Sequence, residues 1–235
     1  MTFSSVPLLV SCALIAGWVA MTPARAADSK DFSAAEQALF VDNHLVKVKP
    51  PLTLHFDFRK SGSLEESFND KIDVALGAQS DGACCTSSAS FMTGTHKVPQ
   101  PEVDGAKANP AILYFLERDI QEMERLTKGK ANYFRKRIRM AVFQGAVIRD
   151  VTLPYRGKPV AVREISIAPY VDDPNRPRYE RLANKRYVFL LASDVPGGLY
   201  GIRTRIDGAS AEAPPLMEEE MLLAGTDTAP VKRQP

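Results

Sequence analysis

Apolar and polar residues alternate most regularly over residues 52–59. The apolar positions are Leu52, Leu54, Phe56 and Phe58, and the polar positions between them are Thr53, His55, Asp57 and Arg59. A period of two with one apolar face predicts a half-buried β-strand. The same period returns at Ile72, Val74 and Leu76, after a turn-rich link around Gly62. We therefore expect two neighbouring antiparallel strands.

A helical period replaces this alternation after residue 109. Asn109 followed by Pro110 is typical of a helix start, because proline has no N–H to leave unpaired and asparagine can accept from the first turn. The apolar stripe of this helix consists of Ile112, Leu116, Ile120 and Met123, with Gly129 placed to stop it. A second stripe consists of Phe134, Ile138, Ala141 and Val142. The two stripes predict a helical hairpin that must bury its apolar side against another layer.

Two further strand pairs are predicted in the second half of the chain. Residues 146–171 predict two strands around a turn between Pro154 and Pro159, and residues 185–206 repeat the form around Pro196 and Gly197. The polar stretch between the pairs is expected to be a surface loop. Residues 211–235 are expected to form a C-terminal tail, with a short helix after Pro215 as one option.

Strands, then a helical pair, then more strands are typical of an α+β fold rather than of a parallel sheet. We expect an antiparallel, strongly twisted sheet, with a half-barrel as its more curved form, and the helical hairpin packed on one face. Residues 51–210 make up this single domain in the prediction. Residues 27–50 precede it as an N-terminal helix and linker, in which Ser33 and Glu36 have the spacing of a capping box.

The first residues have the layout of a secretory signal peptide. An apolar run from Val6 to Met21 is followed by Pro23 and by the small-residue pattern of Ala24 and Ala26. The run is shorter than the roughly 20 residues that span a bilayer. We therefore predict a signal peptide over residues 1–26, a mature chain without a transmembrane segment, and a periplasmic or secreted location. A lipid-attachment motif ending at Cys12 is a less favoured alternative.

The charge balance argues against nucleic acid as a partner. The formal net charge is only +2, so the chain has no overall field that would attract a polyanion. Local patches must carry any such function. The basic cluster Arg135, Lys136, Arg137 and Arg139 could attract lipid head groups or a phosphorylated ligand, but a solvated helix face paired with acidic residues is the favoured interpretation.

Adjacent cysteines, Cys84 and Cys85, are the only cysteines of the predicted mature chain. Glycine and serine around them indicate a loop between strands. An oxidising compartment favours a disulfide, and two such close residues can close only a small ring. Two free thiols, a soft-metal pair and bonds to another chain stay open as alternatives. Thioredoxin-type chemistry is not supported, because it needs two residues between the cysteines.

Signals for metal binding and catalysis are weak. The histidines are His44, His55 and His96, and none has the ligand spacing of a zinc or copper site. His55 and Asp57 share a strand face, as the polar side of a half-buried strand would. The chain also lacks the common hydrolase motifs. No catalytic residue, metal or cofactor is therefore predicted.

The favoured function is that of a non-catalytic accessory or ligand-binding carrier protein of the bacterial envelope, with an apolar small molecule, a lipid or an envelope protein as its partner. A thiol-dependent or otherwise cryptic enzyme and an assembly partner of an envelope complex are the alternatives. A curved sheet roofed by helices can enclose an apolar cavity, although the same residues would equally line a packed core. The predicted walls are Leu54, Phe56, Phe58, Ile72, Val74 and Leu76, capped by Ile112, Leu116 and Ile120.

Overall fold

The computed structural model describes residues 1, 32–210 and 213–226. The chain divides into two units at Asp31 and Phe32, and the following description concerns the second unit. The predicted signal peptide, residues 1–26, lies outside the described residues apart from Met1.

The described chain contains eight strands, four α-helices and several single turns of other helix types. The strands are β1 (Leu52–Ser61), β2 (Phe68–Ala78), β3 (Cys84–Phe91), β4 (Val147–Tyr155), β5 (Lys158–Ile167), β6 (Arg186–Leu191), β7 (Leu199–Ile206) and β8 (Met217–Leu223). The α-helices are α1 (Ala34–Glu36), α2 (Pro110–Thr127), α3 (Ala131–Gln144) and α4 (Arg176–Tyr179). The other turns are η1 (Gln37–Val41), η2 (Gly94–His96), η3 (Glu180–Asn184) and η4 (Pro196–Gly198).

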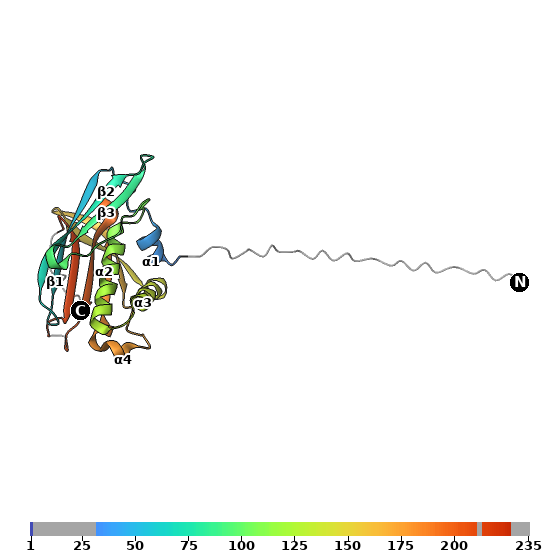
Figure 1. Ribbon diagram of the computed structural model, residues 1–235. Helices are drawn as coiled ribbons and strands as arrows, with labels where there is room; N and C mark the ends of the chain where they lie inside the picture. The colour runs from blue at the N-terminus through green and yellow to red at the C-terminus, as the bar shows by residue number, and fades with distance from the viewer. Residues whose placement is uncertain (2–31, 211–212, 227–235) are drawn as a thin grey trace. The chain divides into compact units, whose positions relative to one another are not determined.

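All eight strands form one antiparallel sheet in the order β3-β2-β1-β8-β7-β6-β5-β4 (Figure 1). The predicted pair is present, with Phe56 of β1 opposite Ile72 of β2. Tyr155, at the tip of the β4–β5 hairpin, forms a bridge with Thr226, which lies just after the end of β8. Even so, β3 and β4 are the two ends of the strand order, so the sheet of the described residues is open. The predicted α+β class and antiparallel sheet are confirmed.

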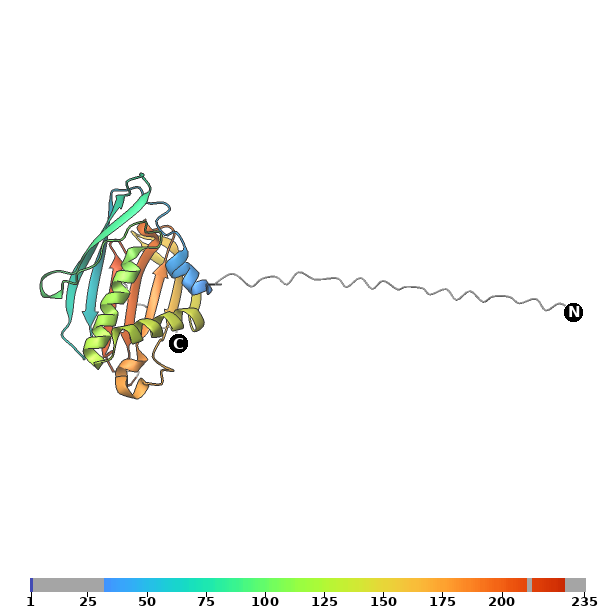
Figure 2. The same ribbon diagram turned by 45° about the vertical axis from the view of Figure 1, so that its right-hand side comes forward.

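Helices α2 and α3 cover one face of this sheet, as Figure 2 shows. The start of α2 is as predicted, because the Asn109 side chain accepts from the backbone N–H of Ala111 and Pro110 is the first helical residue. The helix ends at Thr127, and the left-handed residue after it is Lys128 rather than Gly129. Gly129 has a different constraint, since a Cβ there would lie 2.5 Å from the ring of Phe134.

The predicted capping box at Ser33 and Glu36 is present, and it docks the N-terminal helix on the domain. The Ser33 hydroxyl accepts from the Glu36 N–H, and the Glu36 carboxylate accepts from the Ser33 N–H. The same hydroxyl lies 3.2 Å from the carbonyl oxygen of Val142 in α3. The buried side chains of Ala35 and Leu39 join the main core. Residues 32–50 therefore belong to the same compact unit as the sheet.

The expected C-terminal tail is wrong in one respect, because Met217–Leu223 is strand β8 and not a short helix. It lies between β1 and β7, in the middle of the sheet. Glutamate, methionine and leucine favour helices, and cross-strand pairing overrides that preference here. Glu220 pairs with Arg203 on one neighbouring strand and with Arg59 on the other. The stretch expected to be a surface loop likewise contains α4 and η3.

A network of buried charges joins α2 to the sheet. Lys185, directly before β6, bonds to the carboxylate of Asp119 on α2 and lies 3.5 Å from Glu219 of β8. Arg118 of α2 contacts the other oxygen of Glu219 at 2.5 Å. The Tyr187 hydroxyl donates to Asp119 at 2.6 Å. Lys185, Asp119 and Glu219 are all fully buried.

These charges must stay together, because an unpaired charge in the interior is very costly. Burial alone would raise the pKa of Glu219, but Lys185 and Arg118 hold it at about 2, so the carboxylate is ionised at neutral pH. Thr204 of β7 donates to the same carboxylate at 3.0 Å. A shift of α2 over the sheet would separate Asp119 from Lys185 and Arg118 from Glu219, so the network favours one position of the helix.

Replacing Lys185 by methionine is expected to lower the free energy of unfolding by about 3–5 kcal/mol, because Asp119 loses its buried cation. Urea unfolding followed by circular dichroism measures the change. Lys71→Met at an exposed position of β2 is the control and should stay within about 0.5 kcal/mol of the wild type. A loss below about 1 kcal/mol for Lys185→Met would contradict the network's role.

Candidate ligand-binding groove

A recess of about 710 Å³ opens beside the N-terminal segment and is called the groove below. Residues 42–49 form one side, and residues 161–163 of β5 form the second. The third side is the chain between β6 and η4, residues 191–198. Leu52 of β1, Ala38 of η1 and Asp150 of β4 complete the lining.

The groove opens because β5 continues past the end of β6. The two strands pair only from Ile167 opposite Tyr187 to Arg163 opposite Leu191. Beyond this point β5 extends to Lys158, while the chain after Leu191 turns away through η4. Lys47 reaches across to this turn, and its ammonium donates to the carbonyl oxygen of Ser193 at 3.0 Å.

Two glycines let the η4 turn pack closely, and the predicted turn at Pro196-Gly197-Gly198 is confirmed. Both have positive φ angles, 69° at Gly197 and 70° at Gly198. A Cβ at Gly197 would lie 2.6 Å from Leu54, and one at Gly198 would lie 2.9 Å from the Cβ of His44. Any larger residue would therefore push the turn away from the groove.

His44 and Asn109 connect the three elements around the groove. The backbone N–H of Asn109 donates to His44 Nδ1 at 3.0 Å, and His44 Nε2 lies 2.7 Å from the carbonyl oxygen of Ala38. Nδ1 is thus the acceptor and Nε2 carries the proton. The Asn109 side chain donates to the carbonyl oxygen of Gly197 at 2.8 Å. Burial lowers the pKa of His44 below its ordinary value of 6.5, so the ring is neutral at pH 7.

The groove combines apolar walls with charged groups. The apolar lining includes Val46, Val48, Leu52, Val162, Leu191 and Val195. Its cations are Lys47, Lys49 and Arg163, and its acids are Asp42 and Asp150. Lys47 pairs with Asp194 at 3.6 Å and Arg163 with Asp150 at 3.8 Å, all on exposed side chains, so both pairs are weak. Within the described chain Lys49 has no acidic partner. Such a lining suits an apolar molecule with an anionic group.

The nine residues predicted as cavity walls are all buried in one core cluster. Six come from β1 and β2 and three from α2. None of the nine lines the groove. Their assignment to a ligand site stays a prediction, while their burial is what a packed core requires.

Sequence reasoning missed the groove because its lining comes mainly from irregular chain. Residues 42–49 and 192–198 carry no period of hydrophobic residues. The turn glycines were the one available signal, since a Pro-Gly-Gly sequence indicates a tight turn but not what packs beneath it.

A second recess, of about 630 Å³, lies between α2 and the β1–β2 loop. Lys60 contacts Glu65 at 2.5 Å and Glu122 at 2.7 Å, and Arg125 bonds to both glutamates. These charged groups pair with one another, so the recess offers less to a ligand than the groove does.

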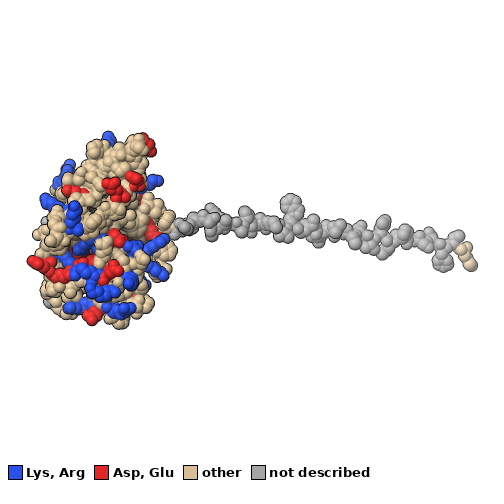
Figure 3. All heavy atoms as spheres, in the orientation of Figure 1, with Lys and Arg blue, Asp and Glu red and all other residues tan. Residues whose placement is uncertain are grey.

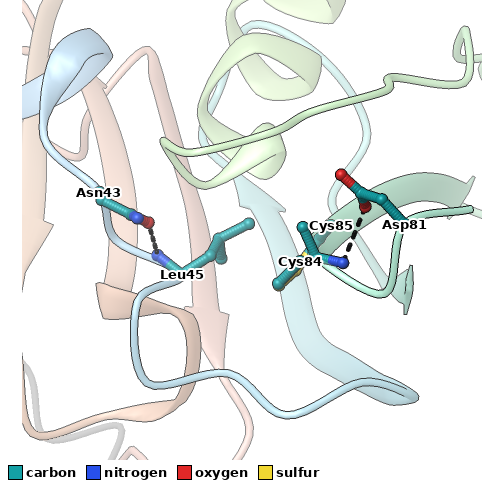
Figure 4. The surroundings of a disulfide bond; sticks show 6 residues. Asn43, Leu45, Asp81, Cys84 and Cys85 are labelled. Atoms are coloured by element: carbon teal, nitrogen blue, oxygen red, sulfur yellow. Dashed lines mark hydrogen bonds between the residues drawn. A yellow bond between two sulfur atoms is a disulfide. The ribbon is translucent and has the colours of Figure 1, made fainter. Parts of the chain in front are cut away.

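The cysteines open strand β3 and are not in a loop, which corrects the sequence-based expectation. Cys84 and Cys85 form a disulfide, and Cys85 is fully buried. Its carbonyl oxygen accepts from the N–H of Ala106 at 3.0 Å. Figure 4 shows the side chain of Leu45 pointing toward the pair. The disulfide thus lies against the segment that forms one side of the groove.

The three histidines have separate partners. His55 pairs with Asp73 on β2 at 2.7 Å, and His96 stacks on Phe68 with ring centroids 3.8 Å apart. In the described residues, no three metal-ligating side chains gather at one place. The helices that the structure describes also include none that is both long and apolar enough to cross a bilayer.

The fold and groove define an open-sheet α+β protein with a ligand-sized recess. No family model matches the sequence, and no curated protein matches it. Among solved structures, the chain is similar to the Mycobacterium tuberculosis lipoprotein LppX, with a TM-score of 0.32 and 12% sequence identity. The match covers 81% of this chain and 93% of that one.

Acid is expected to weaken the connection at His44. The unfolded chain titrates near pH 6.5 and the folded ring below it, so stability is complete above pH 6.5 and is lost as the pH falls through the folded pKa. Nitrogen chemical shifts of the imidazole, followed by NMR, should show a protonated Nε2 at pH 7 and a titration below pH 6.5.

Urea unfolding gives the matching thermodynamic test. His44→Ala should cost about 1–3 kcal/mol at pH 7, because the Asn109 N–H loses its acceptor. The variant should also lack the loss of folding stability that the wild type shows as the pH falls from 6.5 through the folded pKa of His44. His55→Ala, which removes an exposed contact with Asp73, is the control and should cost less than about 1 kcal/mol. A folded-state titration of His44 at or above pH 6.5 would refute the assignment.

Proposed function

We propose that this is an exported, non-catalytic ligand-binding protein of the bacterial envelope, which carries a small apolar molecule with an anionic group in the groove. The observation that supports it is the recess of about 710 Å³ with apolar walls and exposed cations. Small-molecule sites commonly measure about 300–1,000 Å³ and are mostly apolar with a few polar groups that set orientation.

The distribution of charge favours an anionic group on the ligand. The three groove cations are Lys47, Lys49 and Arg163. Lys47 and Arg163 form only weak, exposed ion pairs, and Lys49 has no acidic partner in the described chain. Little free energy is therefore lost when these cations bind an anionic ligand instead. The apolar walls would cover a hydrocarbon body, at about 25 cal/mol for each Å² removed from water.

One side of the groove is held by few bonds, which favours entry of a ligand. Residues 43–49 bond to the rest of the domain through His44, Lys47 and the Leu45 N–H, which donates to Lys107. Asp42 stays bonded to Gln37 of η1, and the Leu45 side chain is buried in the core. Residues 43–49 belong to no strand of the sheet. A segment outside the sheet is more easily displaced than a paired strand.

The alternatives are less well supported. A thiol-dependent enzyme needs an accessible thiolate, whereas Cys85 is buried and joined to Cys84. An assembly partner would use an exposed surface and would have no need of a recess. Two experiments separate these functions.

Filling the groove is expected to weaken ligand binding. Ala161 is exposed and lines the groove, so Ala161→Trp should fill the space without disturbing the core. Fluorescence titration with dansyl-labelled undecanoic acid should show binding by the wild type and an affinity lower by about tenfold or more in the variant, or about 1.4 kcal/mol. Ala75→Trp, at an exposed position of β2, is the matched control.

The anionic group is tested in the same titration with the methyl ester of the probe. The acid should bind more tightly than the ester, and Lys49→Gln should reduce that difference. Equal binding by wild type and Ala161→Trp, or no binding by either, would rule out the groove as the site for this class of ligand.

The cysteines provide the second experiment. Replacing both Cys84 and Cys85 by alanine should leave the affinity for the probe within about twofold, because neither lines the groove. The free energy of unfolding should fall, since the buried disulfide beside Leu45 is lost. If the variant stayed folded and lost all function, the thiol-enzyme alternative would replace the carrier.

A further inference from the structure

The outward face of α3 carries cations and large apolar side chains together. Lys136, Arg139, Met140 and Phe143 follow one another at helical spacing and are all exposed. Phe143 has half of its surface in solvent, at 50%. Directly after the helix, β4 begins with the exposed residues Val147 (51%) and Ile148 (37%). Lys136, Arg139, Met140 and Phe143 are called the α3 stripe below, since consecutive strand residues such as Val147 and Ile148 point to opposite faces of the sheet.

The basic cluster on α3 is only half paired. Arg135 bonds to Glu117 at 2.8 Å, and Arg137 contacts Asp173 at 3.0 Å, as the interpretation of a solvated and paired face expects. Lys136 and Arg139 form no ion pair within the described chain. The two cations without a partner are also the two that share a face with Met140 and Phe143.

Elsewhere on this side of the molecule the charges are mixed. Figure 3 shows Lys and Arg interspersed with Asp and Glu over the domain. Exposed apolar side chains flanked by unpaired cations are typical of a surface that lies in the interface of a membrane, where the apolar groups enter the head-group region and the cations face anionic lipids.

A second copy of the chain fits the α3 stripe less well. A twofold contact would place the same patch on both sides, so it would bring two sets of the cations Lys136 and Arg139 into one interface. Like charges without counter-ions oppose such a contact. An anionic lipid surface supplies the missing negative charge and also accepts Phe143 and its apolar neighbours.

We propose that the α3 stripe docks the protein on anionic lipid membranes. This goes beyond the proposed carrier function and uses residues that do not line the groove. Asp150 of β4, the strand that follows α3, lines the groove, so docking through α3 would bring the groove toward the membrane, where a molecule with an apolar body and an anionic group is available.

Co-sedimentation with vesicles tests the proposal, using protein purified after export with its N-terminus checked by mass spectrometry. Binding is expected to vesicles of phosphatidylcholine with phosphatidylglycerol and not to phosphatidylcholine alone, and it should weaken as salt is added. Lys136→Gln with Arg139→Gln should lower the affinity by about tenfold or more, since each surface cation contributes to attraction. Phe143→Ser should also weaken binding.

The control is Lys71→Gln with Lys97→Gln, which removes the same charge from exposed positions outside the stripe. It should change binding by less than about twofold, because the cations are not next to the apolar patch. Circular dichroism checks that every variant is folded. The stripe variants should bind the dansyl probe as the wild type does, and Ala161→Trp should still sediment, so failure of one function is distinguishable from failure of the other.

Three results would overturn the proposal. One is equal binding to neutral and anionic vesicles, and another is equal loss of binding in the stripe and control variants. The third is concentration-dependent self-association that Phe143→Ser abolishes, measured by light scattering, which would assign the stripe to a second copy of the chain.

Discussion

The buried pairing of Lys185 with Asp119 and Glu219 is the interaction on which the rest of the structure depends. Asp119 lies on α2 and Glu219 on β8, so the pairing fixes the helix to the middle of the sheet. Because the cost of separating buried charges is high, α2 has one favoured position. Asn109, at the start of that helix, hydrogen-bonds to His44 and to the carbonyl oxygen of Gly197, and both of these residues line the groove. The core charges and the groove are therefore connected through α2.

Much of the fold could be predicted where one periodic signal dominates. The alternation around Phe56 and the helical stripe around Leu116 identified the β1–β2 pair and α2, because in both the apolar face is the buried face. Strand β8 could not be predicted in this way. Its glutamates suggest a solvated helix, because their partners in the strand are distant in sequence: arginines on β1 and β7 for Glu220, and Lys185 and Arg118 for Glu219.

The candidate site was less predictable than the fold for a related reason. The groove forms where irregular segments pack beside the end of β5 that is not paired with β6. Local sequence patterns do not predict such tertiary contacts. Periodicity identifies the nine predicted wall residues as buried, but it does not distinguish a cavity from a packed core. Asp119 lies next to Ile120, within the apolar stripe of α2, and an acidic residue at such a position is a feature of the sequence that indicates a buried charge.

The two proposals together are of a protein that docks on a membrane surface through the α3 stripe and carries a molecule in the groove. Native mass spectrometry of the protein purified after export tests this most directly. The account predicts an added mass that organic solvent releases and that is identified as an apolar molecule with an acidic group. A bare protein mass that stays unchanged after incubation with an extract of envelope lipids would contradict it.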